Sequence, residues 1–139
     1  MIYADTSILV GLYVPEPKSD TFQTALSKAQ GVIISGLTEV EFHSAIARRV
    51  RMKEIPRSDG HRVIAQFQLH IKDRVFPLVA LGPREYELAR DWIAAMDTPL
   101  RTLDALHLAA AFTHSLELVT ADQALAKSAR KLGIKAKTL

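Results

Sequence analysis

The sequence predicts an α/β fold, a three-layer α/β/α sandwich with a mainly parallel central sheet. Short apolar runs alternate along the chain with longer segments of helical periodicity. Such an alternation is typical of parallel strands joined by helices that cover both faces of the sheet. No repeat, low-complexity tract or Pro/Gly/Ser-rich linker divides the sequence. We therefore expect residues 1–139 to form a single domain.

Each element is predicted from its apolar pattern and from the residues that end it. Strands are expected over residues 2–5, 32–35, 78–81 and 116–120, with a final edge strand over 134–136. Helices are expected over residues 6–13, 19–29, 38–53, 58–71, 82–96, 102–114 and 122–132. Gly31 and Gly133 each follow a helix and precede a strand.

Composition excludes several classes of protein. The chain has 139 residues, no cysteine, and 18 Lys and Arg against 15 Asp and Glu, a formal charge of +3. Disulfide frameworks, thiolate zinc sites and cysteine nucleophiles are excluded. The small basic excess allows an anionic partner without requiring one. With no basic segment before an apolar run at the N-terminus and no apolar stretch of about 18 residues, we expect a cytoplasmic protein with no membrane association.

Acidic residues gather near the predicted carboxyl ends of the strands, where α/β sheets bind their ligands. Asp5 ends the first strand, and Asp122 lies two residues beyond the fourth. Glu39 and Glu41 lie in the first turn of the helix that follows the second strand, and Asp104 in the first turn of a later helix. Four acidic positions are therefore expected to converge on one edge of the sheet.

Each acid, taken alone, also has an ordinary structural interpretation. Helix N-termini favour Asp and Glu, so Asp5 and Asp122 suit N-caps and Asp104 suits a first-turn position. Thr38 and Glu41 have the spacing of a capping box. The joint pattern is harder to explain in this way, because the helix from Thr102 to His114 is apolar almost all round and should be buried.

A carboxylate at the start of a buried helix needs compensation, which a divalent cation would supply. Mg²⁺ prefers carboxylate oxygens. The absence of cysteine and the scattered histidines disfavour zinc. Spacing alone does not choose between Glu39 and Glu41, because residues two apart point to different sides of a helix.

Two further features have competing interpretations. His107 follows Asp104 by three residues and is within its reach on a helix surface, but a buried structural histidine is favoured over a general base. A basic cluster ends the helix predicted over 38–53. Its cations would complement the helix dipole in solvent or contact RNA or a protein partner. It comprises Arg48, Arg49, Arg51 and Lys53.

Four segments resemble, in order and spacing, the PIN-domain family and, within it, the VapC-type toxin ribonucleases of type II toxin–antitoxin pairs. Together they carry a resemblance that covers almost the whole chain. The segments are residues 1–10 (MIYADTSILV), 37–42 (LTEVEF), 104–109 (DALHLA) and 118–122 (LVTAD). The family's Thr-x-x-Glu pattern selects Glu41 over Glu39.

The resemblance implies a PIN-like fold and a Mg²⁺-dependent endoribonuclease, with Mn²⁺ as the alternative ion, that leaves a 5′-phosphate and a 3′-hydroxyl. It also implies inhibition by a small antitoxin and a homodimer. The catalytic acids would be Asp5, Glu41, Asp104 and Asp122. Asp5 and Asp104 are our expected direct metal ligands, while Thr6 or Ser7, and Thr120, would orient the carboxylates or bind water.

Two other function classes compete with a nuclease. An aspartate-based phosphotransfer protein would use Asp5 as a strand-end nucleophile. Ser7, however, stands where a haloacid-dehalogenase-type site has a second Asp, and no strand-end Lys matches. A non-catalytic PIN-like binding module would keep the acids only for contact with a partner.

Overall fold

A computed structural model describes all 139 residues. The strands are β1 (Ile2–Ala4), β2 (Val32–Ser35), β3 (Leu78–Val79), β4 (Glu117–Thr120) and β5 (Ala136–Thr138). The helices are α1 (Thr6–Tyr13), α2 (Ser19–Ser27), α3 (Gly36–Arg51), α4 (Arg57–Lys72), α5 (Pro83–Ala94), α6 (Thr102–Thr113) and α7 (Gln123–Lys131). Every predicted helix and strand is therefore present.

The strands form one five-stranded parallel sheet in the order β3-β2-β1-β4-β5. β1 lies at its centre, and Tyr3 is opposite Ile33 of β2 and Leu118 of β4. Ala4 is opposite Val119, so the residues that follow these two positions, Asp5 and Thr120, emerge next to each other at the carboxyl edge.

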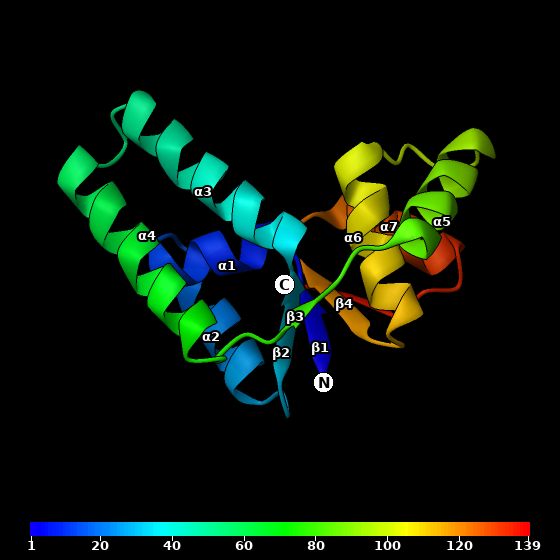
Figure 1. Ribbon diagram of the computed structural model, residues 1–139, viewed down its shortest axis with the longest axis horizontal. Coiled ribbons are helices and arrows are strands. Elements are labelled where there is room, and N and C mark those ends of the chain that lie inside the picture. Colours follow the sequence, from blue (N-terminus) through cyan, green and yellow to red (C-terminus); the bar gives the residue numbers. More distant parts are fainter.

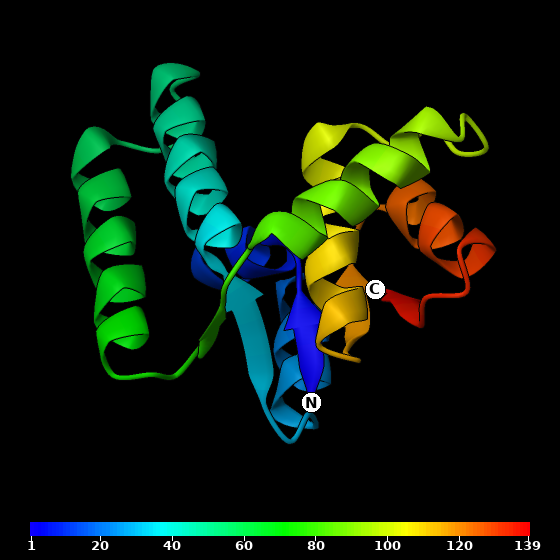
Figure 2. The same ribbon diagram turned by 45° about the vertical axis from the view of Figure 1, so that its right-hand side comes forward.

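Helices cover both faces of the sheet (Figure 1), which confirms the predicted three-layer sandwich. Side chains alternate along a strand, so Ala4 packs with α1, α2, α3 and α4 in one core cluster, where Phe22, Phe42 and Phe67 are fully buried. Tyr3 points the other way, into a second cluster built from α5, α6 and α7. Figure 2 shows α3 and α4 as a hairpin on the opposite side of the sheet from α5 and α6.

The boundaries differ from the predictions where a cap or a short edge strand decides them. α3 begins at Gly36, because Ser35 is its N-cap and forms the capping box with Thr38. The capping box predicted for Thr38 and Glu41 is therefore wrong. The strand expected over 78–81 pairs only at Leu78 and Val79, and the last strand is Ala136–Thr138 rather than 134–136.

No helix of this fold combines the length and the apolar character that crossing a membrane requires. The predicted burial of the helix that carries Asp104 is confirmed: α6 buries every residue from Ala105 to Ala111. The turn that precedes this buried stretch stays nearer the surface: Thr102 and Leu103 are exposed and Asp104 is half-buried.

Candidate active site

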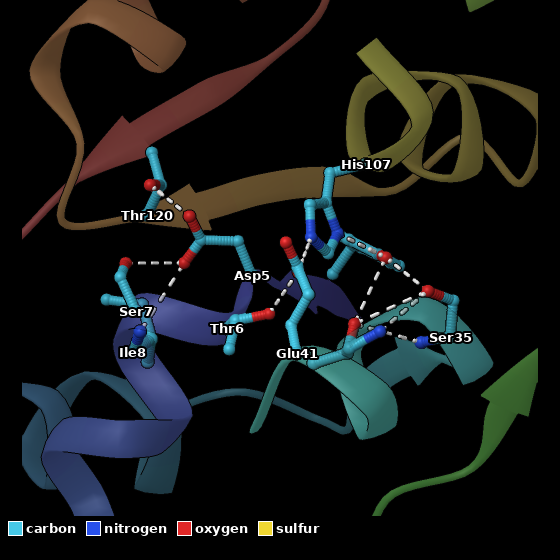
Figure 3. Close-up of polar contacts among 10 residues, drawn as sticks. Asp5, Thr6, Ser7, Ile8, Ser35, Glu41, His107 and Thr120 are labelled. Atoms are coloured by element: carbon cyan, nitrogen blue, oxygen red, sulfur yellow. Dashed lines mark hydrogen bonds and ion pairs between the residues drawn. The ribbon is translucent and has the colours of Figure 1, made fainter. Parts of the chain in front are cut away.

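Asp5 lies at the junction between β1 and α1 and is bound from three sides. It is the N-cap of α1, where its Oδ1 accepts a hydrogen bond from the Ile8 backbone N–H at 3.4 Å. The Ser7 hydroxyl donates to the same oxygen at 2.6 Å, and the Thr120 hydroxyl donates to Oδ2 at 2.6 Å. Figure 3 shows both hydroxyls directed at the carboxylate.

The two hydroxyls are themselves held by backbone groups. The N–H of Ala121 donates to Ser7 Oγ at 3.0 Å, and the N–H of Asp122 donates to Thr120 Oγ1 at 2.9 Å. Each hydroxyl oxygen therefore accepts from the β4–α7 connection and directs its proton to Asp5. The connection after β4 thus fixes the orientation of a carboxylate that belongs to β1.

Asp5 is a buried acid with no basic partner. Its side chain pairs with no Lys or Arg, and the residue is only 6% exposed. Burial raises the pKa of Asp5, although the hydrogen bonds from Ser7 and Thr120 and the nearby His107 act in the opposite direction. An ionised Asp5 is therefore costly to the fold unless a positive charge joins it.

Glu41, in the second turn of α3, faces the same edge of the sheet. Thr6 Oγ1 donates to Glu41 Oε2 at 2.6 Å, and Nε2 of His107 lies 2.5 Å from the same oxygen (Figure 3). Partial burial by itself would raise the pKa of Glu41, but the bonds from His107 and Thr6 outweigh it, so the pKa is lowered. Glu41 is thus held in its ionised form, whereas the Glu39 side chain has no hydrogen bond or ion pair.

Sequence reasoning missed the polar network behind Glu41. The Tyr3 hydroxyl lies 2.8 Å from His107 Nδ1, 2.8 Å from Ser35 Oγ and 3.3 Å from Thr38 Oγ1. Burial raises the pKa of Tyr3 to about 12. The available signal was a tyrosine in an apolar strand and a histidine in an apolar helix, because buried polar groups need partners.

Asp104 and Asp122 are placed differently from Asp5. Asp104 is half-buried in the first turn of α6, and its side chain has no hydrogen bond or ion pair. His107, which spacing put within reach of Asp104, instead bonds Tyr3 and Glu41. Asp122 is exposed and caps α7 through Oδ1, which accepts from the N–H groups of Ala124 at 2.7 Å and Leu125 at 3.0 Å.

These carboxylates fit a hard divalent cation by their chemistry. No three Asp, Glu or His side chains stand close enough together to hold a metal ion by themselves. Mg²⁺, however, keeps several waters and commonly takes only one or two protein carboxylates. Asp5 and Asp104 each have carboxylate oxygens without a Lys or Arg partner, and carboxylate oxygens are the kind of ligand that such an ion prefers.

The basic cluster lies at the far end of α3 from Glu41. Arg49 is half-buried and pairs with Glu16 at 3.3 Å and with Glu54 at 3.6 Å, so it has a structural role. Arg48, Arg51 and Lys53 are exposed. Only these three therefore stay available as contacts for RNA or a partner.

Comparison with known proteins matches the sequence profile of the PIN domain to residues 2–131. The chain belongs to the PIN-domain family. It is also 31% identical over 136 residues to ribonuclease VapC46 of Mycobacterium tuberculosis, covering 96% of this chain and 93% of VapC46. The predicted resemblance to VapC-type PIN proteins is thereby confirmed.

Solved structures share this PIN fold. VapC20 of M. tuberculosis, described as a sarcin–ricin loop cleaving toxin, superposes with a TM-score of 0.70 at 18% identity, covering 85% of this chain and 87% of VapC20. VapBC2 from Rickettsia felis, bound to a DNA fragment from its promoter, gives a TM-score of 0.70 at 18% identity, with 99% and 98% covered. At these identities the likeness concerns the fold.

Proposed function

We propose that this PIN-domain protein is a metal-dependent endoribonuclease and the toxin of a toxin–antitoxin pair, with residues 1–139 acting as one unit. The observation that carries the proposal is Asp5, a buried carboxylate without a basic partner that hydroxyls from β4 and α1 hold at the carboxyl edge of the sheet. The 31% identity to a VapC ribonuclease supports the same chemistry.

In this proposal the four acidic residues have two roles: some bind the ion directly, and the others bind its waters. Asp5 and Asp104 would hold Mg²⁺, or Mn²⁺ in its place, and Glu41 and Asp122 would bind its waters or a second ion. The bound ion supplies an activated water and neutralises charge on the phosphate. Ser7 and Thr120 keep Asp5 from rotating, and Thr6 does the same for Glu41.

The acidic edge also explains why substrate binding should depend on the ion. Carboxylates alone repel an RNA backbone, and a bound cation reverses the local charge. A small antitoxin with basic residues would suit the same edge, and the match to a VapBC complex supports a partner of this kind. We propose a homodimer as the form of the free toxin.

RNA cleavage by purified protein tests the proposal. The wild-type chain and D5N are purified in parallel and incubated with total RNA and Mg²⁺ or Mn²⁺, with and without EDTA, and new 5′ ends are mapped. Cleavage by the wild type alone, abolished by EDTA and leaving 5′-phosphates, supports the proposal. Equal cleavage by D5N, or cleavage that EDTA leaves intact, contradicts it.

Phosphotransfer through Asp5 has less support. Both of its carboxylate oxygens accept hydroxyl hydrogen bonds, which reduce the nucleophilicity of a carboxylate. A non-catalytic binding module stays as the alternative, and it predicts tight antitoxin binding with no cleavage in the assay above.

A further inference from the structure

A buried chain of polar side chains runs from the start of α3, through the centre of the sheet, and back to α3. Ser35 Oγ lies 2.8 Å from the Tyr3 hydroxyl, which lies 2.8 Å from His107 Nδ1. His107 Nε2 lies 2.5 Å from Glu41 Oε2. Three elements, β1, α3 and α6, are therefore joined through one imidazole.

The ionised carboxylate of Glu41 fixes which atom donates in each of these hydrogen bonds. An ionised carboxylate only accepts, so the short contact with Glu41 requires the proton on Nε2 of His107. In the neutral ring Nδ1 is then an acceptor, and the Tyr3 hydroxyl must donate to it. Tyr3 in turn accepts from Ser35, so no donor or acceptor of the ring is left unpaired.

The network acts on only one oxygen of Glu41. Thr6 and His107 both bond Oε2, and no hydrogen bond involves Oε1. The Glu41 side chain is 23% exposed and has several rotatable bonds, whereas that of His107 is 4% exposed. A rigid buried donor therefore holds a flexible acid by one oxygen and leaves the other oxygen without a protein partner.

We propose that His107 is a positioning residue that aims Glu41 at the metal and its water, with Tyr3 holding the imidazole in the required tautomer. The proposal rests on the proposed nuclease function, and it assigns to His107 a role beyond filling the core. Partners that orient a metal-binding or catalytic group typically contribute 10- to 100-fold in affinity or activity.

Two amide substitutions separate positioning from packing. H107Q puts an amide nitrogen near the position of Nε2 and can still donate to Glu41. H107N places its amide near Nδ1, so it can bond Tyr3 but does not reach Glu41. The two variants each remove one hydrogen bond and have similar size and polarity, so a merely structural role predicts similar losses of activity in both.

We expect H107N to lower kcat by about 10- to 100-fold with little change in KM, and H107Q to recover most of that loss. Thermal unfolding midpoints of the two variants should be similar. Equal activity in the wild type and H107N, or equal losses in H107N and H107Q, would overturn the role of His107.

Two measurements without RNA keep this test separate from that of the nuclease. Nitrogen NMR of His107 in the metal-free wild type should show the proton on Nε2, and a proton on Nδ1 would overturn the proposal. Mn²⁺ affinity should fall in H107N and largely recover in H107Q. If the wild type cleaves no RNA but the Mn²⁺ affinities follow this order, the nuclease proposal fails and the positioning role stands. Equal Mn²⁺ affinities in the two variants overturn the positioning role.

Discussion

Asp5 and Asp122 both precede a helix and both accept hydrogen bonds from its first turn, yet their surroundings differ. Asp122 is exposed and uses one oxygen for two backbone N–H groups, as an ordinary N-cap does. Asp5 is buried and receives two hydroxyl protons in addition to its backbone contact. An N-cap geometry therefore does not by itself exclude a functional role, and the oriented hydroxyls mark the difference.

The largest effect is expected from removing the charge of Asp5. Asparagine still caps α1, so D5N should fold, but it should lower metal-dependent RNA cleavage by about 100-fold or more. Initial cleavage rates measured beside circular dichroism spectra check this expectation. A folded D5N with unchanged activity would show that Asp5 acts only as an ordinary N-cap.

The next largest loss of activity is expected from removing the charge of Glu41, and Glu39 offers a matched control. E41Q removes the charge that Thr6 and His107 orient, and it should lower activity by about 10- to 100-fold. E39Q makes the same change two residues away, where the side chain has no partner, and should leave activity unchanged. The same rate assay compares the two variants. A larger loss of activity in E39Q than in E41Q would show that Glu39, and not Glu41, serves the site.

A stability measurement tests the charge on Asp5 independently of RNA. Burial raises the pKa of Asp5 in the folded protein, so ionisation costs stability as pH rises through that value. Below the unfolded-state pKa near 4 the cost is absent. Without metal, D5N should therefore become more stable than the wild type as pH rises above about 4.

Chemical denaturation across pH gives this comparison. Adding Mg²⁺ should stabilise the wild type and reduce the difference in unfolding free energy between it and D5N, because an ion that binds only the folded state shifts the equilibrium toward that state. If the metal-free wild type is instead more stable than D5N at neutral pH, the hydrogen bonds to Asp5 stabilise its ionised form without any cation.

Asp122 separates capping from catalysis. D122A removes the cap and should cost about 1 kcal/mol of stability, whereas D122N keeps the cap. If Asp122 also serves the reaction, D122N should lose activity while its unfolding midpoint stays near that of the wild type. Full activity in D122N would limit this acid to its structural role.

The smallest effect concerns the opposite, basic end of α3. Replacing the exposed Arg48 and Arg51 with Gln should weaken RNA binding and lower the salt-dependence slope by about one for each phosphate that is no longer neutralised. Fluorescence anisotropy at several salt concentrations measures the slope. An unchanged slope would assign these cations to solvent or to a protein partner.

Most of the fold is predictable because apolar periodicity is a local signal, as is Gly133, which follows α7 with a positive φ, whereas α2 ends at Ser27, before Gly31. The capping box is not, because Ser35 and Thr38 compete with Thr38 and Glu41 for the same spacing and only tertiary packing decides. The approach of Asp5 to Thr120 follows from parallel strands ending at one edge. The link from Tyr3 through His107 to Glu41 spans 104 and 66 residues along the chain, so no local pattern reveals it.

Mn²⁺ binding to the wild type and to D5N, followed by electron paramagnetic resonance, tests most directly whether this edge of the sheet holds a divalent cation. We predict that the wild type binds Mn²⁺, that Mg²⁺ competes for the site, and that D5N weakens binding at least about tenfold. Equal binding by the two proteins, or none by the wild type, would contradict a metal site at this edge of the sheet.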